Sequence, residues 1–331
     1  MRTTPLCQQL EIQLPILCAG MGGGIAGPEL VGAVSNAGGL GVLGMLGLPP
    51  PLIRQQIQHT RTLSPRPFGG NLVVPFLQGG ELDVCFDEQV PVLVLFWGDP
   101  QPLVADAHRR GIKVIMQVGS VQEASTAAAA GVDAIMAQGV EAGGHVRSTT
   151  ALSILVPSVV EAVRPLPVIA AGGIATGRGL AAALSLGAQA VSIGTRFLCS
   201  EEARVTRAYK ERIVNSRAED TVYTTLFDIG WPGAPHRVLR NKTVTEWEAA
   251  GCPPSGRRPG EGSVIGTATL AGMTVPAIRY STIPPVTGFE GDMEYAALYC
   301  GESCSLVNDI KPAAQIVEDI MREADAAAQQ L

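Results

Sequence analysis

One of only four histidines in this 331-residue chain follows two glycines, in the stretch QGVEAGGHVR at residues 138 to 147. An imidazole titrates near neutral pH, so a histidine that reaches a substrate can act there as a general base. Gly143 and Gly144 remove two Cβ atoms and allow positive φ, which lets the backbone lie close to a flat ligand. His145 is therefore a candidate catalytic residue, and a loop histidine without a catalytic role is the alternative that the spacing leaves open.

A second set of glycines ends two consecutive apolar runs later in the chain. Gly172 and Gly173 end the run PVIAAGG, and Gly194 and Thr195 end the run AVSIGT. Both pairs precede helix-like segments, where backbone N–H groups commonly bind phosphate. Glycines in such places also make tight turns without any ligand. Two glycine-bearing loops on consecutive strands favour a phosphate site over turns alone.

The glycines of CAGMGGGIAGPEL, after the first apolar run, look only superficially like a dinucleotide-binding fingerprint. No acidic residue ends the second run, where that fingerprint needs one to bind a ribose. We expect Ala19, Gly20 and Met21 to lay backbone against a planar ring instead. Asn71 and Gln117 are amides at the ends of two later runs, where they could bond the polar edge of such a ring.

Eight short runs rich in Val, Ile and Leu supply a frame for these residues. The runs are continuous rather than alternating, which is typical of parallel strands buried on both faces. Eight such strands with intervening helices predict a (β/α)8 or TIM barrel, whose active site lies at the carboxyl ends of the strands. His145 and both glycine pairs follow runs at that end. The runs are PILCA from Pro15, GLGVLG from Gly39, GGNLVV from Gly69, PVLVLF from Pro91, KVIMQV from Lys113, DAIMAQ from Asp133, PVIAAG from Pro167 and AVSIGT from Ala190.

Helix signals separate these runs. Pro28 and Gly38 mark the start and the stop of one helix. Ser120 is the expected N-cap of another helix, with Glu123 as a candidate capping-box partner and Gly131 as the stop. The predicted alternation of strands and helices therefore rests on residues that start and stop helices as well as on the hydrophobic runs.

The alternation stops after the eighth run, and we divide the chain there into three parts. Residues 1–218 are the predicted barrel, residues 219–305 an insertion or lid region, and residues 306–331 a C-terminal helix that packs back on the barrel. Within the lid region, residues 220–281 are rich in Pro, Gly, Thr and basic residues. The last segment returns to helical periodicity, with Pro312 near its start.

Composition limits the partners. Hydrophobic residues make up 46% of the chain, and its net charge of -6 lacks the basic excess that nucleic acids and anionic membranes attract. Seven cysteines without a C-x-x-C pair argue against a disulfide framework or a zinc site and favour the cytoplasm. The charge-free span 31–53 holds six glycines and three consecutive prolines, so we assign it to the barrel rather than to a membrane helix. We expect a small-molecule partner, and a homodimer is left open.

Four stretches together resemble the nitronate monooxygenase family, formerly called 2-nitropropane dioxygenases. They are EAGGH at 141–145, AAGGIATGRGLAAALSLGAQAVSIGTRFL at 170–198, GGLGVLG at 38–44 and YCGESCSLVNDIKPAAQIVEDI at 299–320. The family consists of FMN-dependent barrels, and the resemblance spans nearly the whole chain. It implies that His145 is the catalytic histidine. It also implies an FMN phosphate at Gly172, Gly173, Gly194 and Thr195, and an isoalloxazine ring at Ala19, Gly20, Met21, Asn71 and Gln117. Gly143 and Gly144 join the expected cofactor-binding residues because they allow close approach of the backbone.

The resemblance further implies a reaction. Family members oxidise alkyl nitronates or nitroalkanes with O2 to carbonyl compounds and nitrite, and the cofactor carries the redox chemistry. Two positions depart from the family pattern: Arg147 stands where a glycine is usual, and Glu302 makes CGES out of AGQS. A guanidinium near the mouth could fill space or bind an anionic substrate. These departures therefore bear on the substrate more than on the cofactor.

Other functions remain open alongside this one. FMN-dependent enoyl-acyl-carrier-protein reductases and NADH:quinone reductases share the barrel and many of its motifs, with NAD(P)H as the electron donor. EAGGH and the stretch RVLRNKTVTEW, from Arg237, look more like the monooxygenase branch. A phosphate-binding barrel without flavin, such as a sugar-phosphate isomerase, is a further alternative, but we find no acid–base pair of carboxylate and lysine at convincing strand ends. A flavin-binding protein without turnover is the remaining alternative.

Overall fold

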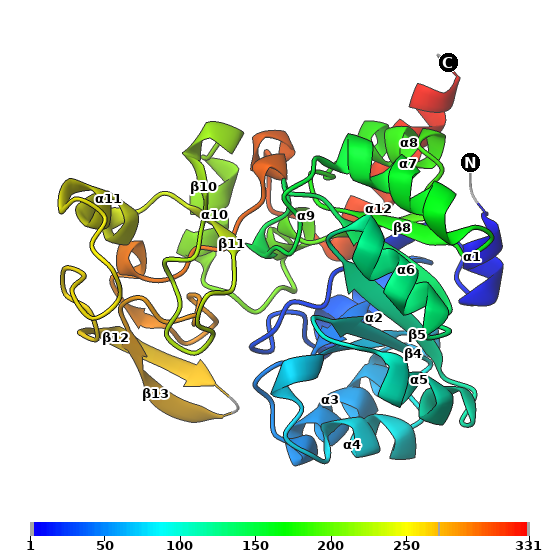
Figure 1. Ribbon diagram of the computed structural model, residues 1–331, viewed down its shortest axis with the longest axis horizontal. Helices are drawn as coiled ribbons and strands as arrows, with labels where there is room; N and C mark the ends of the chain where they lie inside the picture. The colour runs from blue at the N-terminus through cyan, green and yellow to red at the C-terminus, as the bar shows by residue number, and fades with distance from the viewer. Residues whose placement is uncertain (1–2, 271, 330–331) are drawn as a thin grey trace.

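Eight parallel strands form a barrel in the larger part of the molecule (Figure 1). This computed structural model describes residues 3–270 and 272–329. The strand order is β1-β9-β8-β6-β5-β4-β3-β2, and a parallel bridge between Leu17 and Leu40 brings the two edges together. The predicted TIM barrel is confirmed. Its strands are β1 Ile16–Cys18, β2 Val42–Gly44, β3 Gly69–Val73, β4 Val92–Phe96, β5 Lys113–Val118, β6 Ala134–Gln138, β8 Val168–Ala171 and β9 Ala190–Ile193.

Helices cover the outside of the barrel (Figure 1). Pro28 occupies the first turn of α2, and Gly38 follows the end of that helix with a φ of 97°, so both predicted signals are confirmed. The helices are α1 Pro5–Gln9, α2 Pro28–Asn36, α3 Pro50–Leu63, α4 Glu81–Asp87, α5 Gln101–His108, α6 Val121–Ala129, α7 Leu152–Val163, α8 Gly177–Ser185, α9 Thr195–Leu198, α10 Arg207–Val214, α11 Lys242–Ala249 and α12 Ala313–Ala328.

The start of α6 differs in one detail from the predicted capping box. The Ser120 hydroxyl accepts a hydrogen bond from the N–H of Glu123, at 3.2 Å, as expected. The Glu123 carboxylate reaches the N–H of Gly119, at 2.7 Å, instead of the N–H of Ser120. Because Glu123 Oε1 also accepts from Arg147 Nε at 2.8 Å, this cap is joined to the loop that follows His145.

Two apolar layers stabilise the barrel. The outer layer lies between the strands and the surrounding helices. The inner layer fills the barrel with side chains from several strands, and α1 adds residues to it from the end at which the strands begin. Burying one large aliphatic side chain is worth about 1.5–3 kcal/mol. The inner layer includes Leu6, Leu10, Val92, Val94, Ile115, Met136 and Ile169.

The charge-free span 31–53 belongs to the barrel, as predicted. It contains most of α2, the whole of β2 and the first residues of α3. Among the helices of residues 3–270 and 272–329, none is both long enough and apolar enough to cross a membrane.

The lid region, residues 219–305, forms a smaller body beside the barrel, at the left of Figure 1. One of its two small sheets has the order β10-β11-β7, with β10 at Thr221–Thr224, β11 at His236–Leu239 and β7 at Gly144–His145. Since β7 is part of the loop after β6, this sheet joins the lid region directly to the barrel. The other sheet has the order β13-β12-β14, from Met273–Ile278, Val264–Leu270 and Glu290–Gly291.

The C-terminal helix α12 returns to the barrel, where it packs against α8 and α2 (Figure 1). Its Glu323 carboxylate accepts a hydrogen bond from the N–H of Gly177, at 2.9 Å, at the start of α8. Pro312 precedes its first turn, as expected from the sequence. The helix therefore closes the outer layer between the first and last parts of the barrel.

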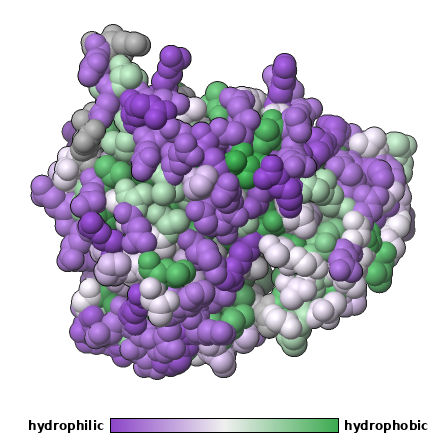
Figure 2. Space-filling view, turned by 180° about the vertical axis from the view of Figure 1, so that it is seen from behind, coloured by the Kyte–Doolittle hydropathy of each residue, from purple (hydrophilic) through white to green (hydrophobic). Residues whose placement is uncertain are grey.

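The outer surface is mainly hydrophilic on the face shown in Figure 2, where hydrophobic residues gather only in small groups. Exposed large apolar side chains include Ile154 on α7, Val264 on β12 and Met273 on β13. Scattered exposed apolar residues are common on proteins in water.

We predict that Ile115→Ala lowers the free energy of unfolding by about 2–5 kcal/mol, because it leaves a cavity inside the barrel. Ile115 is 0% exposed, and Ile154, on the outside of α7, is 61% exposed. Ile154→Ala is the matched control and should change the same free energy by about 0.5 kcal/mol or less. Chemical denaturation of both variants is the measurement. Equal losses in the two variants would contradict the inner-layer assignment.

Candidate active site

A cavity of about 430 Å³ lies between the barrel and the lid region, at the carboxyl ends of the strands. Its volume falls within the usual range for small-molecule sites. The structure brings together at its walls every residue that the sequence singled out for catalysis or cofactor binding. These are Ala19, Gly20, Met21, Asn71, Gln117, Gly143, Gly144, His145, Gly172, Gly173, Gly194 and Thr195.

The walls of this cavity carry no formal charge. Within the part of the chain that the structure describes, no Asp, Glu, Lys or Arg side chain lines the cavity. The barrel contributes backbone and amide groups. The lid region contributes a largely apolar side, formed by Trp231, Leu270, Ile283, Pro284 and Tyr299. The site therefore suits a ligand held mainly by shape, stacking and backbone hydrogen bonds.

His145 is fixed by its backbone on both sides. It lies in β7, where it pairs with His236 of β11. Gln138, at the end of β6, donates from Nε2 to the His145 carbonyl at 3.0 Å and accepts from the N–H of Arg147 at 3.2 Å. The Gln138 side chain is buried, so these bonds compete little with water. The loop after β6 therefore holds the imidazole at the cavity wall.

The imidazole of His145 lies against aromatic rings. Its ring centroid is 4.1 Å from that of Trp231, and the planes are 29° apart, which is a stacked arrangement. Burial, together with the neighbouring His236, lowers the pKa of His145 from 6.5 to about 3. No residue of the described chain is hydrogen-bonded to its buried Nε2 atom. The imidazole is therefore neutral at physiological pH, which corrects the expectation of a pKa near neutrality.

His236 has a different character, although it lies near His145. Its Nε2 accepts a hydrogen bond from the N–H of Phe227 at 3.2 Å, and its Nδ1 lies 2.9 Å from the carbonyl of Ala234. These two contacts require the neutral tautomer with hydrogen on Nδ1. Burial also lowers the pKa of His236. Since both nitrogens are engaged, His236 is a structural residue in this arrangement.

The two glycine pairs lie at adjacent strand ends. Gly172 and Gly173 follow β8 with φ values of 96° and 69°. Backbone N–H groups at turns of this kind commonly bind anions. At Gly194, after β9, an added Cβ would meet only Ala19 within 4 Å, at 3.8 Å. Thr195 Oγ1 accepts from the N–H of Gly301 at 3.0 Å, which leaves its own O–H to donate to a ligand.

The start of α8 is occupied differently. The N–H of Gly177 donates to Glu323, and the Thr176 hydroxyl accepts from the N–H of Gly179. A carboxylate at that point would repel a second anion. The first turn of α8 therefore does not suit an anion, whereas no carboxylate of the described residues lines the cavity at the two glycine turns.

Close packing explains Gly20 and the amide opposite it. A Cβ on Gly20 would lie 2.2 Å from the Cβ of Asn71, so only glycine fits. Asn71 Nδ2 donates to the carbonyl of Val94 at 3.0 Å, which leaves its Oδ1 for a ligand. The Gln117 side chain lines the cavity and is hydrogen-bonded to none of the described residues. Both predicted amides thus lie at the cavity. The Asn71 amide is held by one hydrogen bond, and the Gln117 amide by none among the described residues.

The two glycines before His145 serve different purposes. A Cβ on Gly143 would lie 2.3 Å from the backbone nitrogen of Gly301, so this glycine is required by packing against a distant segment. Gly144 has a φ of 75° and nothing within 4 Å of an added Cβ. Room for a flat ligand was the predicted reason for both glycines, and the geometry supports that reason only at Gly144.

The departures from the family pattern have partners outside the cavity. Arg147 lies over the Trp97 ring, at 4.7 Å, pairs with Glu123 and does not line the cavity. Glu302 pairs with Arg237, with 3.0 Å between Oε1 and Nη2. Glu141, the first residue of EAGGH, accepts from the N–H of Leu152 at the start of α7. Direct binding of substrate by Arg147 therefore has no support in this geometry.

Sequence reasoning missed the aromatic side of the cavity. Trp231 and Tyr299 come from the lid region, and Phe76 comes from the short helix η1, Val74–Phe76, after β3. A tryptophan inside the turn-rich stretch FDIGWPGAPH was a usable signal, because a large aromatic in a loop is often a binding residue. No periodicity, however, indicates which barrel loop it reaches.

A comparison with protein families matches this chain to the family model described as nitronate monooxygenase, over residues 3–82 and 76–323. Among curated proteins, a Mycobacterium tuberculosis protein named (3aS,4S,5R,7aS)-5-hydroxy-7a-methyl-1-oxo-octahydro-1H-indene-4-carboxyl-CoA dehydrogenase is 39% identical over 74% of this chain and 68% of its own. A probable nitronate monooxygenase of Staphylococcus aureus is 33% identical over 73% of this chain and 79% of its own.

Two solved structures are similar to this chain over nearly its whole length. FabK from Thermotoga maritima has a TM-score of 0.82 and 33% identity, covering 100% of this chain and 98% of its own. A nitroalkane oxidase from Streptomyces ansochromogenes has a TM-score of 0.79 and 28% identity, covering 99% of each chain. The family match extends over nearly all of the barrel, the lid region and α12, so this chain is an oxidoreductase that belongs to the nitronate monooxygenase family.

Proposed function

We propose that the protein is an FMN-dependent nitronate monooxygenase, which oxidises alkyl nitronates or nitroalkanes with O2 to carbonyl compounds and nitrite. The observation that carries this proposal is the unpartnered, buried Nε2 of His145 in a cavity without charged side chains. A buried polar atom without a partner costs about 1–3 kcal/mol, so a ligand is its natural partner. His145 is the catalytic residue of this proposal.

The residues at the cavity fit FMN. The turns at Gly172 and Gly173, with Gly194 and Thr195 beside them, offer backbone N–H groups and one hydroxyl to a phosphate. The backbone of residues 19–21, with Asn71 and Gln117, offers a flat surface and amide groups to the ring. Among the described residues, the two neighbouring glycine turns offer a place for one phosphate, and the sequence has no fingerprint for a second nucleotide, which favours FMN over FAD.

FMN, when bound, supplies the redox chemistry, and the protein positions the substrate. A neutral imidazole can accept a proton from a carbon acid or donate N–H to a nitro oxygen. Because its pKa is about 3, His145 is a weak base before substrate binds. This favours the preformed nitronate anion over the neutral nitroalkane, since the anion needs no proton removed. In the low dielectric of uncharged, largely buried walls, hydrogen bonds to that anion are stronger than in water.

A second candidate is a flavin-dependent enzyme that acts on acyl thioesters or uses NAD(P)H. It is favoured by the similarity to FabK over the whole chain and by the 39% identity to the mycobacterial CoA dehydrogenase. Its substrates are longer than simple nitronates. The apolar side formed by Leu270, Ile283 and Pro284 could accept an acyl chain.

We expect the flavin released from purified protein to have the mass of FMN, and Gly194→Asp to give colourless protein. The aspartate would set a carboxylate against the phosphate dianion. Gly194 has a φ of -101°, and its Cβ position is open, so Gly194→Ala is a matched control that should stay yellow. Retained flavin in Gly194→Asp would refute the phosphate site. Gly173→Asp should also lose flavin but is a less clean test, because the φ of 69° there adds strain.

His145→Ala should keep the yellow colour and lower kcat/KM for neutral nitroalkanes by roughly 100-fold or more, as losses of a general base do. Turnover of preformed nitronates should suffer less. His108→Ala, at an exposed histidine paired with Asp133, is the control and should leave both activities unchanged. Normal nitroalkane activity in His145→Ala with full flavin content would remove His145 from the mechanism.

The pH dependence should carry no signature of His145 near neutrality. Its folded-state pKa is lowered to about 3, so protonation and loss of the neutral imidazole begin only well below pH 6. For wild-type enzyme, kcat/KM with a preformed nitronate should therefore be flat between pH 6 and pH 8. A rise in kcat/KM with a midpoint near 6.5 that His145→Ala abolishes would contradict this.

Electron donors separate the two candidate functions. We expect an alkyl nitronate to bleach the flavin under anaerobic conditions within one turnover, and NADH and NADPH to bleach it far more slowly. Stopped-flow absorbance of the oxidised flavin is the measurement. Bleaching by NADH or NADPH alone, with none by the nitronate, would replace the proposed function with the second candidate.

A further inference from the structure

Trp231 is the lid residue in closest aromatic contact with His145. Its ring stacks on the imidazole at 4.1 Å and also touches two barrel aromatics, Trp97 and Phe76, with 4.8 Å between centroids in each case. Trp97 follows β4 and has a φ of 61°, which bulky residues rarely adopt. Three loops at the carboxyl ends of the strands thus meet one side chain of the lid region.

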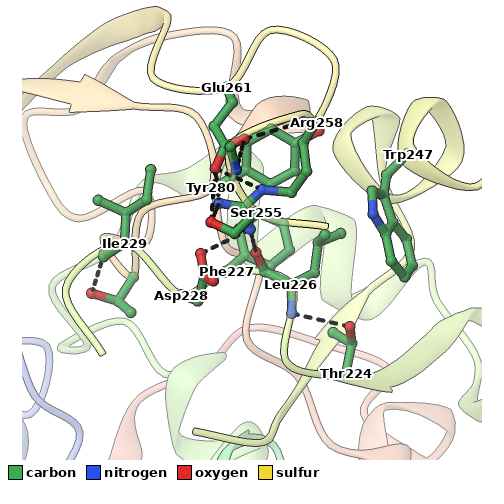
Figure 3. A network of polar contacts seen from close by, with 12 residues as sticks. Thr224, Leu226, Phe227, Asp228, Ile229, Trp247, Ser255, Arg258, Glu261 and Tyr280 are labelled. Carbon is green, nitrogen blue, oxygen red and sulfur yellow. Dashed lines mark hydrogen bonds and ion pairs between the residues drawn. The ribbon is translucent and has the colours of Figure 1, made fainter. Parts of the chain in front are cut away.

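A polar network around the buried Arg258 holds residues 226–229, which precede Trp231 in the chain (Figure 3). The Arg258 side chain is only 3% exposed, and its Nη1 donates to the carbonyl of Leu226 and to Asp228 Oδ1, both at 2.8 Å. Its Nε donates to Glu261 Oε1 at 2.9 Å. The N–H of Trp231 then donates to the carbonyl of Asp228 at 3.0 Å. Arg258 is therefore linked to Trp231 through Asp228, which accepts from both residues.

A second tie holds the same segment from its other side. The N–H of Ile229 donates to the carbonyl of Tyr280, and the N–H of Thr282 donates to the carbonyl of Ile229, both at 3.1 Å. The Arg258 guanidinium also lies over the Tyr280 ring, at 4.3 Å. The turn before Trp231 is thus anchored at both edges, so the stacking on His145 is a fixed part of the lid region.

From this geometry we infer that Trp231 is a positioning residue for His145, set by the Arg258–Asp228 pair, which fixes the plane of the imidazole and keeps water from it. The inference deepens the proposed function, because it assumes that His145 is the reacting group. The side chain at position 231 covers one face of the ring and leaves Nε2 as the point at which a substrate is met. The lid region thereby positions the imidazole of His145 through the side chain of Trp231.

Few titratable groups face His145. His236 of β11 is 5.5 Å away and neutral, and Tyr299 is 5.6 Å away. Burial raises the pKa of the Tyr299 phenol, so it too is neutral. The nearest cations on adjoining segments, Arg147 and Arg237, are paired with Glu123 and Glu302. Removal of Trp231 therefore changes the hydration of His145 without leaving a new charge beside it.

The test follows His145 itself, by NMR of ring-labelled histidine in flavin-containing protein from pH 5 to pH 8. Wild type should show no titration of His145 in this range, since its pKa is about 3. In Trp231→Ala, water reaches the ring, and His145 should titrate within the range. Trp231→Phe keeps an aromatic ring and should behave like wild type. Val264→Ala is the control, because Val264 lies in the lid region, is 66% exposed and does not line the cavity.

Activity supplies an independent readout. In Trp231→Ala, kcat/KM for a nitronate should change with pH around the new midpoint of His145, whereas wild type stays flat. Asp228→Asn, which weakens the hold of Arg258, should move both readouts in the same direction by a smaller amount. If Trp231→Ala does not fold, Trp231→Leu takes its place.

An unchanged His145 titration in folded Trp231→Ala would overturn the inference. A shifted titration in a protein that does not oxidise nitronates would leave the inference standing and reject the proposed function instead. The two failures are therefore distinguishable, because the NMR measurement needs no turnover. Titration of His145 between pH 5 and pH 8 in Val264→Ala as well would also overturn the inference, since the effect would then belong to the lid region as a whole.

Discussion

The pairing of β7 with β11 is the contact on which the site depends. Two residues of a barrel loop, Gly144 and His145, form a strand with residues of the lid region, Arg237 and His236. That pairing places the lid region over the open end of the barrel, and it buries an imidazole that would otherwise lie in a solvated loop. Gln138 supports the same loop from the barrel side. The lid region and the barrel thus build the site together, through backbone bonds at the candidate catalytic residue.

An uncharged cavity has consequences for every group that lines it. With low dielectric and no counter-charge, burial disfavours the protonated imidazole, which is why the pKa of His145 falls so far. The same walls offer an anion only backbone N–H groups and neutral side chains. Such groups bind a phosphate or a nitronate without the strong pairing that Lys or Arg would supply. The site is therefore organised by geometry rather than by charge.

The charged side chains near the site lie behind the cavity walls and do not line the cavity. Arg237 is buried, donates to the carbonyl of Val140 at 2.9 Å and pairs with Glu302. Glu302 N–H in turn donates to the carbonyl of Glu141. The carboxylate that departs from the family pattern thus ties the segment after Tyr299 to the loop that carries His145. These contacts support the cavity wall from the outside, and no charged group among them lines the cavity.

The barrel was predictable because its signals are local: eight apolar runs, glycine turns at their ends, and helix caps such as Pro28 and Ser120 are all read along the chain. The site residues that follow strands were predictable for the same reason, since the ends of parallel strands meet at one rim. The side of the cavity built by Trp231 and Tyr299 was not predictable, because its contacts join residues far apart in sequence. The neutrality of His145 also needed the tertiary structure, since burial by β11 and Trp231, and not the residue type, sets its pKa. Gly143 is the clearest single case: the sequence shows a glycine before a histidine, and only the fold shows the backbone of Gly301 filling the space where a Cβ would be.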